Sequence, residues 1–222
     1  MKTLIRNFLV LIFLITLSSC TQTINYESEK KHIEIKKEII NYKGKTFSGV
    51  LLFDYENGQL QTKINLRKGK RDGLTEFYNK NGKIGGKVNY KNGKEDGLSE
   101  LYYENGQLKL KMIYKDGKKD GPGQTYYENG QLYIKQNYKN GKEDGLYETY
   151  NKNGQPEMKI NYKDGKKDGT YKLYYENGQL ERKGNYKDGK EDGLIEFYNE
   201  NGQLKLSGIM KDGVVTPTFF EK

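Results

Sequence analysis

The sequence has no tryptophan and no alanine, and its 222 residues include one cysteine, one histidine and three prolines. A single cysteine cannot form an internal disulfide framework. The lack of alanine and the presence of 27 glycines disfavour a large helical domain. So few His and Cys residues argue against a metal or catalytic centre built from them. We therefore expect no metal, no cofactor and no catalytic residue.

What the chain does contain is 20 tyrosines, many glycines and 31% charged residues. Aromatic residues punctuated by glycine indicate short strands joined by tight turns. The formal net charge is +9, and it falls to +7 once the first 19 residues, with Lys2 and Arg6, are removed. Charges of both signs are interspersed, which is typical of a solvated surface. We expect no nucleic acid partner, because the N-terminal residues, described next, predict that the protein is exported.

The first residues have the layout of that signal. Lys2 and Arg6 precede an apolar run from Leu9 to Leu17, which is followed by Ser18, Ser19 and Cys20. A basic start, an apolar core and small residues at the cut are the marks of a secretory leader. An apolar core of about nine residues is too short to span a bilayer as a helix. Residues 1–19 are predicted to be a signal peptide.

The end of the leader resembles the lipobox of bacterial lipoproteins, which is a leucine, two small residues and then cysteine. The resemblance implies that Cys20 becomes the lipidated first residue. It implies an exported, membrane-anchored bacterial lipoprotein, periplasmic or at the cell surface. The alternative is an ordinary cleaved signal in which Cys20 has no such role. Inner and outer membrane both stay open.

A repeat of 24 residues dominates the remaining chain. The dipeptide Asn-Gly recurs in seven copies at equal intervals, and two further glycine series run in phase with it. A fixed period in this range indicates units that bury their surfaces on their neighbours. The predicted organisation is seven repeats over 45–213, preceded by a lipidated N-terminus and tether at 20–44. Within that segment, Glu27 to Ile40 is charged with scattered isoleucines and fits a tether, a short helix or an edge strand. The segment 214–222 is expected to be a C-terminal cap or tail.

Each unit is predicted to be a β-hairpin. Asn105-Gly106 favours a type I′ turn, and Lys115 to Lys118 forms the next turn. Repetition gives an all-β fold, an elongated antiparallel meander in a single-layer sheet. About fourteen strands at roughly 4.8 Å each make a body ~65 Å long.

A two-residue Asn-Gly loop fixes the register, which can be checked on charges. It places opposite charges, or apolar residues, across each pair of strands, and such pairs stabilise a sheet. A three-residue loop would put Glu100 opposite Leu110. The expected pairs are Glu76 with Lys87, Glu100 with Lys111, Glu148 with Lys159, Leu101 with Leu110, Phe197 with Leu206, Thr149 with Met158 and Tyr175 with Leu180.

In this register, two recurring series share the face that carries the Glu–Lys pairs. We treat them as the candidate interaction surface. The lysines are either a comb for anionic groups or a solvated face paired with glutamates. The tyrosines are either a binding ridge or a cover for a thin sheet. The series are Lys63, Lys87, Lys111, Lys135, Lys159 and Lys183, and Tyr78, Tyr102, Tyr126, Tyr150, Tyr174 and Tyr198.

The run Y-Y-E-N-G-Q-L, followed by Y-K-D-G-K-x-D-G, resembles the bacterial variant of the MORN repeat over about residues 45–213. The resemblance implies a row of β-hairpins in one extended sheet. Proteins with this variant are often labelled as antitoxins or as phosphatidylinositol phosphate kinases. The chain lacks a phosphate-binding loop with its lysine and the H-R-D and D-F-G motifs, so a kinase is not expected.

The sequence therefore predicts a non-enzymatic, lipid-anchored cell-envelope protein whose sheet binds another protein, with an envelope protein as the expected partner. Many weak, equally spaced contacts would sum along the array. A first alternative is binding of anionic lipid headgroups or envelope polymers through the lysines. A second is an antitoxin-like or immunity-like inhibitor of a partner protein. Self-association is left open.

Overall fold

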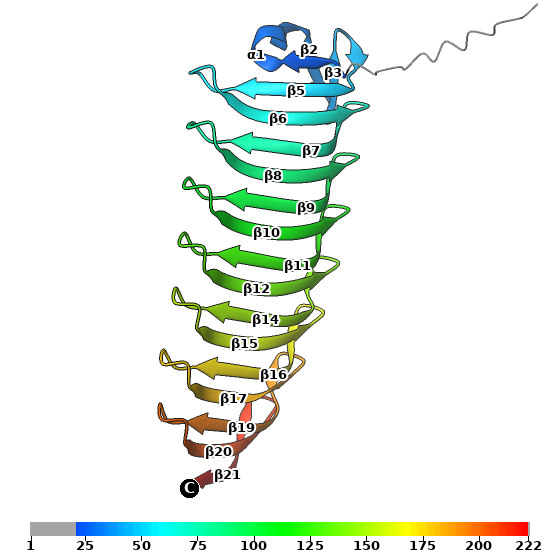
Figure 1. The fold of residues 1–222 in the computed structure, drawn as a ribbon. Coiled ribbons are helices and arrows are strands. Elements are labelled where there is room, and N and C mark those ends of the chain that lie inside the picture. Colours follow the sequence, from blue (N-terminus) through cyan, green and yellow to red (C-terminus); the bar gives the residue numbers. More distant parts are fainter. Residues whose placement is uncertain (1–20, 222) are drawn as a thin grey trace, which may run out of the picture.

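The computed structural model describes the backbone of residues 21–221 and the side chains of residues 21–214, so the expected leader and Cys20 lie outside the described residues. Its largest element is an 18-stranded sheet. Figure 1 shows hairpins stacked in chain order, from β5 (Gly49–Asp54) to β21 (Val214–Glu221). Successive strands pair antiparallel. The expected all-β meander of 24-residue hairpins is confirmed.

Between these two ends, two strand positions are each occupied by a pair of shorter strands. β13 and β14 both pair with β12, and β18 and β19 both pair with β17. The intervening strands are β6 (Leu60–Arg67), β7 (Lys70–Tyr78), β8 (Ile84–Lys91), β9 (Lys94–Tyr102), β10 (Leu108–Lys115), β11 (Lys118–Tyr126), β12 (Leu132–Lys139), β13 (Lys142–Glu143), β14 (Gly145–Tyr150), β15 (Pro156–Lys163), β16 (Lys166–Tyr174), β17 (Leu180–Lys187), β18 (Lys190–Glu191), β19 (Gly193–Tyr198) and β20 (Leu204–Lys211).

The type I′ turns lie at the other end of the hairpins from the one expected. Lys115 pairs with Lys118, so Asp116 and Gly117 form a two-residue loop with φ of 49° and 81°. Positive φ at both central positions defines a type I′ turn. In the Asn-Gly loops only the glycine has positive φ. The expectation of a type I′ turn at Asn105-Gly106 is therefore wrong.

The Asn-Gly loops have three residues, and a bulge corrects the register beyond them. The Tyr103 amide donates to the Gln107 carbonyl, and the Gly106 amide donates back to the Tyr103 carbonyl. This is a type I turn followed by a left-handed glycine. One extra residue in the second strand, Lys109 in β10, then shifts the pairing by one position.

Because of this shift, the central register equals the one expected from a two-residue loop. Six of the seven expected pairs are present. The pairing of Tyr175 with Leu180 is wrong, since Tyr174 faces Leu180 and the Tyr175 amide closes the loop on Gln179.

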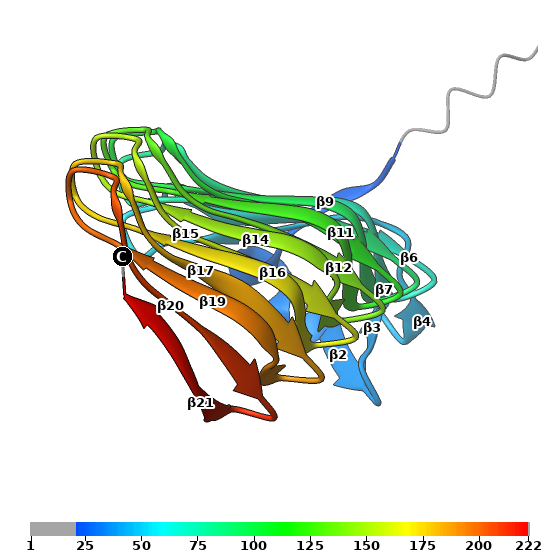
Figure 2. The ribbon, with the colours of Figure 1, turned by 90° about the horizontal axis from the view of Figure 1, so that it is seen from below.

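An Asp-Gly pair interrupts the first strand of each unit. Met112 faces Gly123 and Tyr114 faces Lys119, so β11 has two residues more than β10 between these pairs. Gly121 adopts a φ of 121° there, a conformation that favours glycine. The same shift recurs at every unit boundary. Figure 2, which looks along the array, shows the curved strands one behind the other.

The bulge also joins consecutive units. The Asp116 amide donates to the Asp96 carboxylate at 3.2 Å, and the Gly117 amide donates to the Glu95 carbonyl at 2.8 Å. Both central amides of a type I′ turn are thus held by the preceding unit. Equivalent bonds link four further pairs of units, and the Ser48 hydroxyl takes the role of the aspartate at the first.

Residues 21–46 are folded against the first hairpin. β1 (Thr23–Asn25) pairs parallel with β5, and α1 (Tyr26–Glu29) and the 3₁₀ helix η1 (Lys30–His32) follow. A small sheet is formed by β2 (Ile33–Lys36), β3 (Ile39–Tyr42) and β4 (Lys45–Thr46). The main compact core lies here and comprises Ile24, Phe47, Leu51, Ile64 and Leu66.

Asp96→Ala removes the acceptor for the Asp116 amide, so we expect a loss of about 1 kcal/mol in the free energy of unfolding. Asp96→Ser keeps an oxygen in the arrangement seen at Ser48, and should cost less. Urea unfolding measures both. Glu104→Ala, in an exposed Asn-Gly loop, is the control and should stay within about 0.5 kcal/mol. Equal losses in Asp96→Ala and Glu104→Ala would contradict this role of the aspartate.

Candidate interaction surface

The two faces of the sheet differ in chemistry. We call the face with the Glu–Lys pairs the charged face, and the opposite one the core face. On the core face, one row of residues is buried along the array, with Met112 at 1% and Ile160 at 3% exposure. The charged face carries both candidate series, because the expected register holds on it.

Lysine and glutamate alternate along the first strands of the charged face. Lys63 faces Glu76, which faces Lys87, and this order continues to Lys111 on β10. Direct ion pairs join Lys63 to Glu76 at 3.0 Å and Lys183 to Glu196 at 2.8 Å. The hydrogen bond that the Lys63 ammonium donates to Glu76 raises the pKa of Lys63. The solvated, paired interpretation therefore describes part of the lysine series.

The alternation breaks three times in the second half, at Gln124, at Lys172 and at Ser207, which faces Glu196. Gln124 stands between Lys111 and Lys135, and Lys172 stands directly between Lys159 and Lys183. The ammonium group of Lys172 is exposed and forms no ion pair with any residue that the structure describes. Like charges directly opposite each other destabilise a sheet. This part of the row carries an excess of positive charge.

Glu148 lies at the centre of that part and is only 5% exposed. Lys159 approaches it at 2.9 Å and Lys135 at 3.4 Å, one from each neighbouring strand. Burial acts to raise the pKa of Glu148. Hydrogen bonds from Lys159 and Tyr150, together with the two positive charges, outweigh burial and leave the pKa below its ordinary value.

The tyrosines of the candidate series are half-buried beside the charged row. Tyr102 faces Leu108, and its hydroxyl donates to the Glu100 carboxylate at 2.9 Å. Burial, followed by that hydrogen bond, raises the pKa of Tyr102. These half-buried rings cover part of the sheet and leave one edge exposed for contact. The series is therefore compatible both with a cover for the sheet and with a binding ridge.

Two further tyrosine series were not singled out from the sequence. Tyr90, Tyr114, Tyr138, Tyr162 and Tyr186 lie beyond the Asp-Gly bend on the core face. Tyr162 packs on Tyr147 and Tyr186 on Tyr171, with ring centroids 5.9 and 4.8 Å apart. Burial raises the pKa of Tyr171. The sequence feature that could have identified these tyrosines is their constant position directly before each Lys-Asp-Gly or Lys-Asn-Gly turn.

The third series ties the Asn-Gly ends of successive units together. The Tyr103 hydroxyl donates to the Tyr126 carbonyl at 2.7 Å, and the same bond recurs 24 residues on, from Tyr127 to Tyr150. Tyr55 and Tyr175 repeat it. These tyrosines are structural, because their hydroxyl groups serve the next repeat.

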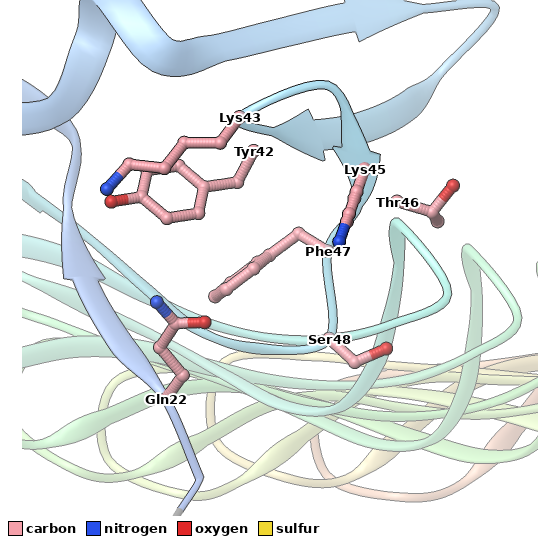
Figure 3. Close-up of a pocket in the computed structure, with 7 residues that line it drawn as sticks. All are labelled: Gln22, Tyr42, Lys43, Lys45, Thr46, Phe47 and Ser48. Carbon is pink, nitrogen blue, oxygen red and sulfur yellow. The ribbon is translucent and has the colours of Figure 1, made fainter.

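Cavities in the described part of the chain are open. One of about 600 Å³ lies beside the N-terminal segment, where the Phe47 ring points toward Gln22 (Figure 3). Tyr42 packs edge-on against Phe47, and the hydrogen bond that the Lys43 ammonium donates to Tyr42 raises the pKa of Lys43. Two smaller hollows, of about 380 and 210 Å³, lie on the charged face.

Within the described residues, His, Cys, Asp and Glu side chains form no group of three that could hold a metal ion. The same residues include no helix long and apolar enough to cross a membrane. The geometry defines the class: a tandem β-hairpin repeat protein with its recurring side chains displayed on one face.

The family model of the MORN repeat variant matches six successive segments, which together make up more than half of the chain: 71–92, 95–116, 119–140, 143–164, 167–188 and 191–212. The chain belongs to the MORN repeat variant family. The first of the seven expected repeats lies before these segments. A search of curated proteins finds no match for the chain.

Glu148→Gln leaves two lysines without their shared carboxylate. We expect it to lower the free energy of unfolding by about 1–3 kcal/mol at pH 7. Because the folded-state pKa of Glu148 is depressed, its contribution is complete above the unfolded pKa and is lost as pH falls through the folded pKa. The difference between wild type and variant should therefore vanish in acid, as urea unfolding from pH 7 to pH 2.5 would measure.

Glu76→Gln is the matched control, since Glu76 has one ion pair and is more exposed. It should cost less at pH 7. A Glu148→Gln penalty that stayed constant into acid would show that charge is not its cause.

Proposed function

We propose that this chain is a non-enzymatic, lipid-anchored protein of the bacterial cell envelope whose charged face binds another protein. The observation that carries the proposal is the regular spacing of the recurring side chains on that face. Similar side chains recur at every second strand, about 10 Å apart, and the hollows among them are shallow. Such a surface suits many weak contacts along an extended partner, which sum by avidity.

The anchor is supported by the sequence alone. Lys2, Arg6, the apolar run and the small residues before Cys20 have the order that export and lipidation require. Acyl chains hold a protein at a membrane through burial of CH₂ groups, at about 0.8 kcal/mol each. Cys20 directly precedes the first described residue, Thr21.

A second candidate function is binding of anionic lipid headgroups or envelope polymers. The cluster of Lys159, Lys172 and Lys183 favours it, because three ammonium groups on adjacent strands attract negative charge without regard to sequence. Such binding would weaken strongly with salt, since exposed charges are screened within about 8 Å at physiological ionic strength.

Crosslinking in the source cells, with a C-terminal tag and mass spectrometry, tests protein binding. We expect one dominant envelope protein. Changing Tyr102 and Tyr126 together to serine should reduce capture about tenfold or more, because buried aromatic anchors are worth about 2 kcal/mol. The pair changed to phenylalanine is the control for ring packing and should retain most of the capture. Recovery of lipid or polymer alone, lost at high salt, would overturn protein binding.

Cys20→Ala tests the anchor. The wild-type chain should partition into the detergent phase of a membrane extract, and the variant into the aqueous phase, because the variant lacks the acyl chains. Metabolic labelling with a fatty acid should mark only the wild-type chain. Equal partition of both forms without label would reject the lipid while leaving protein binding open.

A further inference from the structure

The two hollows on the charged face are the same site, repeated two units apart. Seven of the eight residues that line each hollow have a counterpart 48 positions away in the other, the pair Gln136 and Gly184 among them. The first hollow is lined by Pro122, Gln124, Lys135, Asn137, Leu146 and Glu148. The second is lined by Thr170, Lys172, Lys183, Asn185, Leu194 and Glu196.

These hollows coincide with the departures from the repeat. Other units carry leucine followed two positions later by glutamate, as at Leu98 and Glu100. Pro122 and Thr170 replace the leucine, and both are shorter. The leucines that wall the hollows, Leu146 and Leu194, are 41% and 47% exposed, whereas Leu98 is half-buried. Each hollow therefore offers an accessible apolar wall.

The same departures set the charge around the hollows. Gln124 and Lys172 stand where glutamate alternates elsewhere. Lys135 borders one hollow, Lys172 and Lys183 border the other, and Lys159 lies between them. Glu148 is buried between Lys135 and Lys159, and Glu196 in the second hollow pairs with Lys183 at 2.8 Å, so four lysines face two carboxylates and the stretch keeps an excess of positive charge. An acidic partner complements this stretch.

The spacing of the hollows indicates the partner's conformation. From Gln124 to Lys172 the sheet advances four strands, about 19 Å at 4.8 Å per strand. Six residues of an extended chain cover about 20 Å at 3.3 Å per residue. Since six is even, two side chains at that interval point to the same side of an extended peptide.

We propose that the charged face binds an acidic peptide segment in extended conformation, which lies across the strands with apolar side chains six residues apart in the two hollows. Carboxylates between them lie on Lys159 and Lys172. The Asn137 amide nitrogen already donates to the Asp144 carbonyl at 2.8 Å, so its side-chain oxygen is the group that would accept from the peptide backbone, and Asn185 is its counterpart in the second hollow. The proposal rests on the proposed protein-binding function and names the chemistry of the partner segment.

Fluorescence polarisation with the full chain tests it. The probe is a labelled peptide of about thirteen residues, rich in Asp and Glu, with two leucines six positions apart. The control peptide has the same composition with the leucines five positions apart, so that they point to opposite sides. We expect the control to bind about tenfold weaker, the effect of leaving one leucine outside its hollow.

The variant with Thr170→Leu and Lys172→Glu closes one hollow with the residue types found at Leu146 and Glu148. It should fold, because the chain already accepts those types at equivalent positions. We expect the six-spaced peptide to bind it about tenfold weaker. The matched control is Lys152→Glu, which changes the net charge equally in an exposed loop where Glu128 and Glu176 are the counterparts. It should change the affinity less than twofold.

Equal affinity for the two peptides would overturn the proposal, as would equal weakening by Lys152→Glu, since both would mean attraction by net charge alone. Displacement of the six-spaced peptide by inorganic polyphosphate as readily as by unlabelled peptide would also overturn it. If these peptides fail while crosslinking captures a protein on other residues, protein binding stands and this segment assignment falls. If neither succeeds, both fall.

Discussion

The structure depends on the bend that each unit makes at its Asp-Gly pair. A single-layer sheet has no second layer to cover its apolar residues. The bend brings a second row of side chains, such as Tyr186, onto the buried row that contains Tyr171. It also aims the Asp96 carboxylate at the amide of the next turn. Burial and unit-to-unit hydrogen bonding thus share one backbone feature, and neighbouring units stabilise one another as in other linear repeat arrays.

The period and the alternation of residue types were enough to predict the sheet and its central register, because a slip by one residue would turn every Glu–Lys pair to the opposite face. The turn types were not predictable from the dipeptides, since both ends of each hairpin carry a residue followed by glycine. Contacts between units decide them. The amides of Asp116 and Gly117 are bonded to the preceding unit, whereas the Tyr103 hydroxyl serves the following one. The sequence pattern of a single unit does not show which groups of the neighbouring units its turns will bond to.

The N-terminal segment shows the same limit. Its charged sequence with scattered isoleucines fits a tether, a short helix or an edge strand equally well, and the structure contains the last two. What selects them is the open side of β5, which gives β1 a strand to pair with and Ile24 a core to enter. A lipid on Cys20 would then join the chain immediately before this folded segment, so the array would begin close to the membrane.

For the candidate surface, the residues that obey the repeat and those that break it have different roles. Recurring residues satisfy needs that several units share, such as the Asp96 carboxylate or the Tyr103 hydroxyl, and selection for folding alone explains them. Pro122 and Thr170 meet no such need, because the leucine found elsewhere would cover more of the sheet. Lys172 even sets like charges face to face. Local losses of packing and charge balance on one face, spaced to suit one extended chain, are more economically explained by a ligand than by the fold.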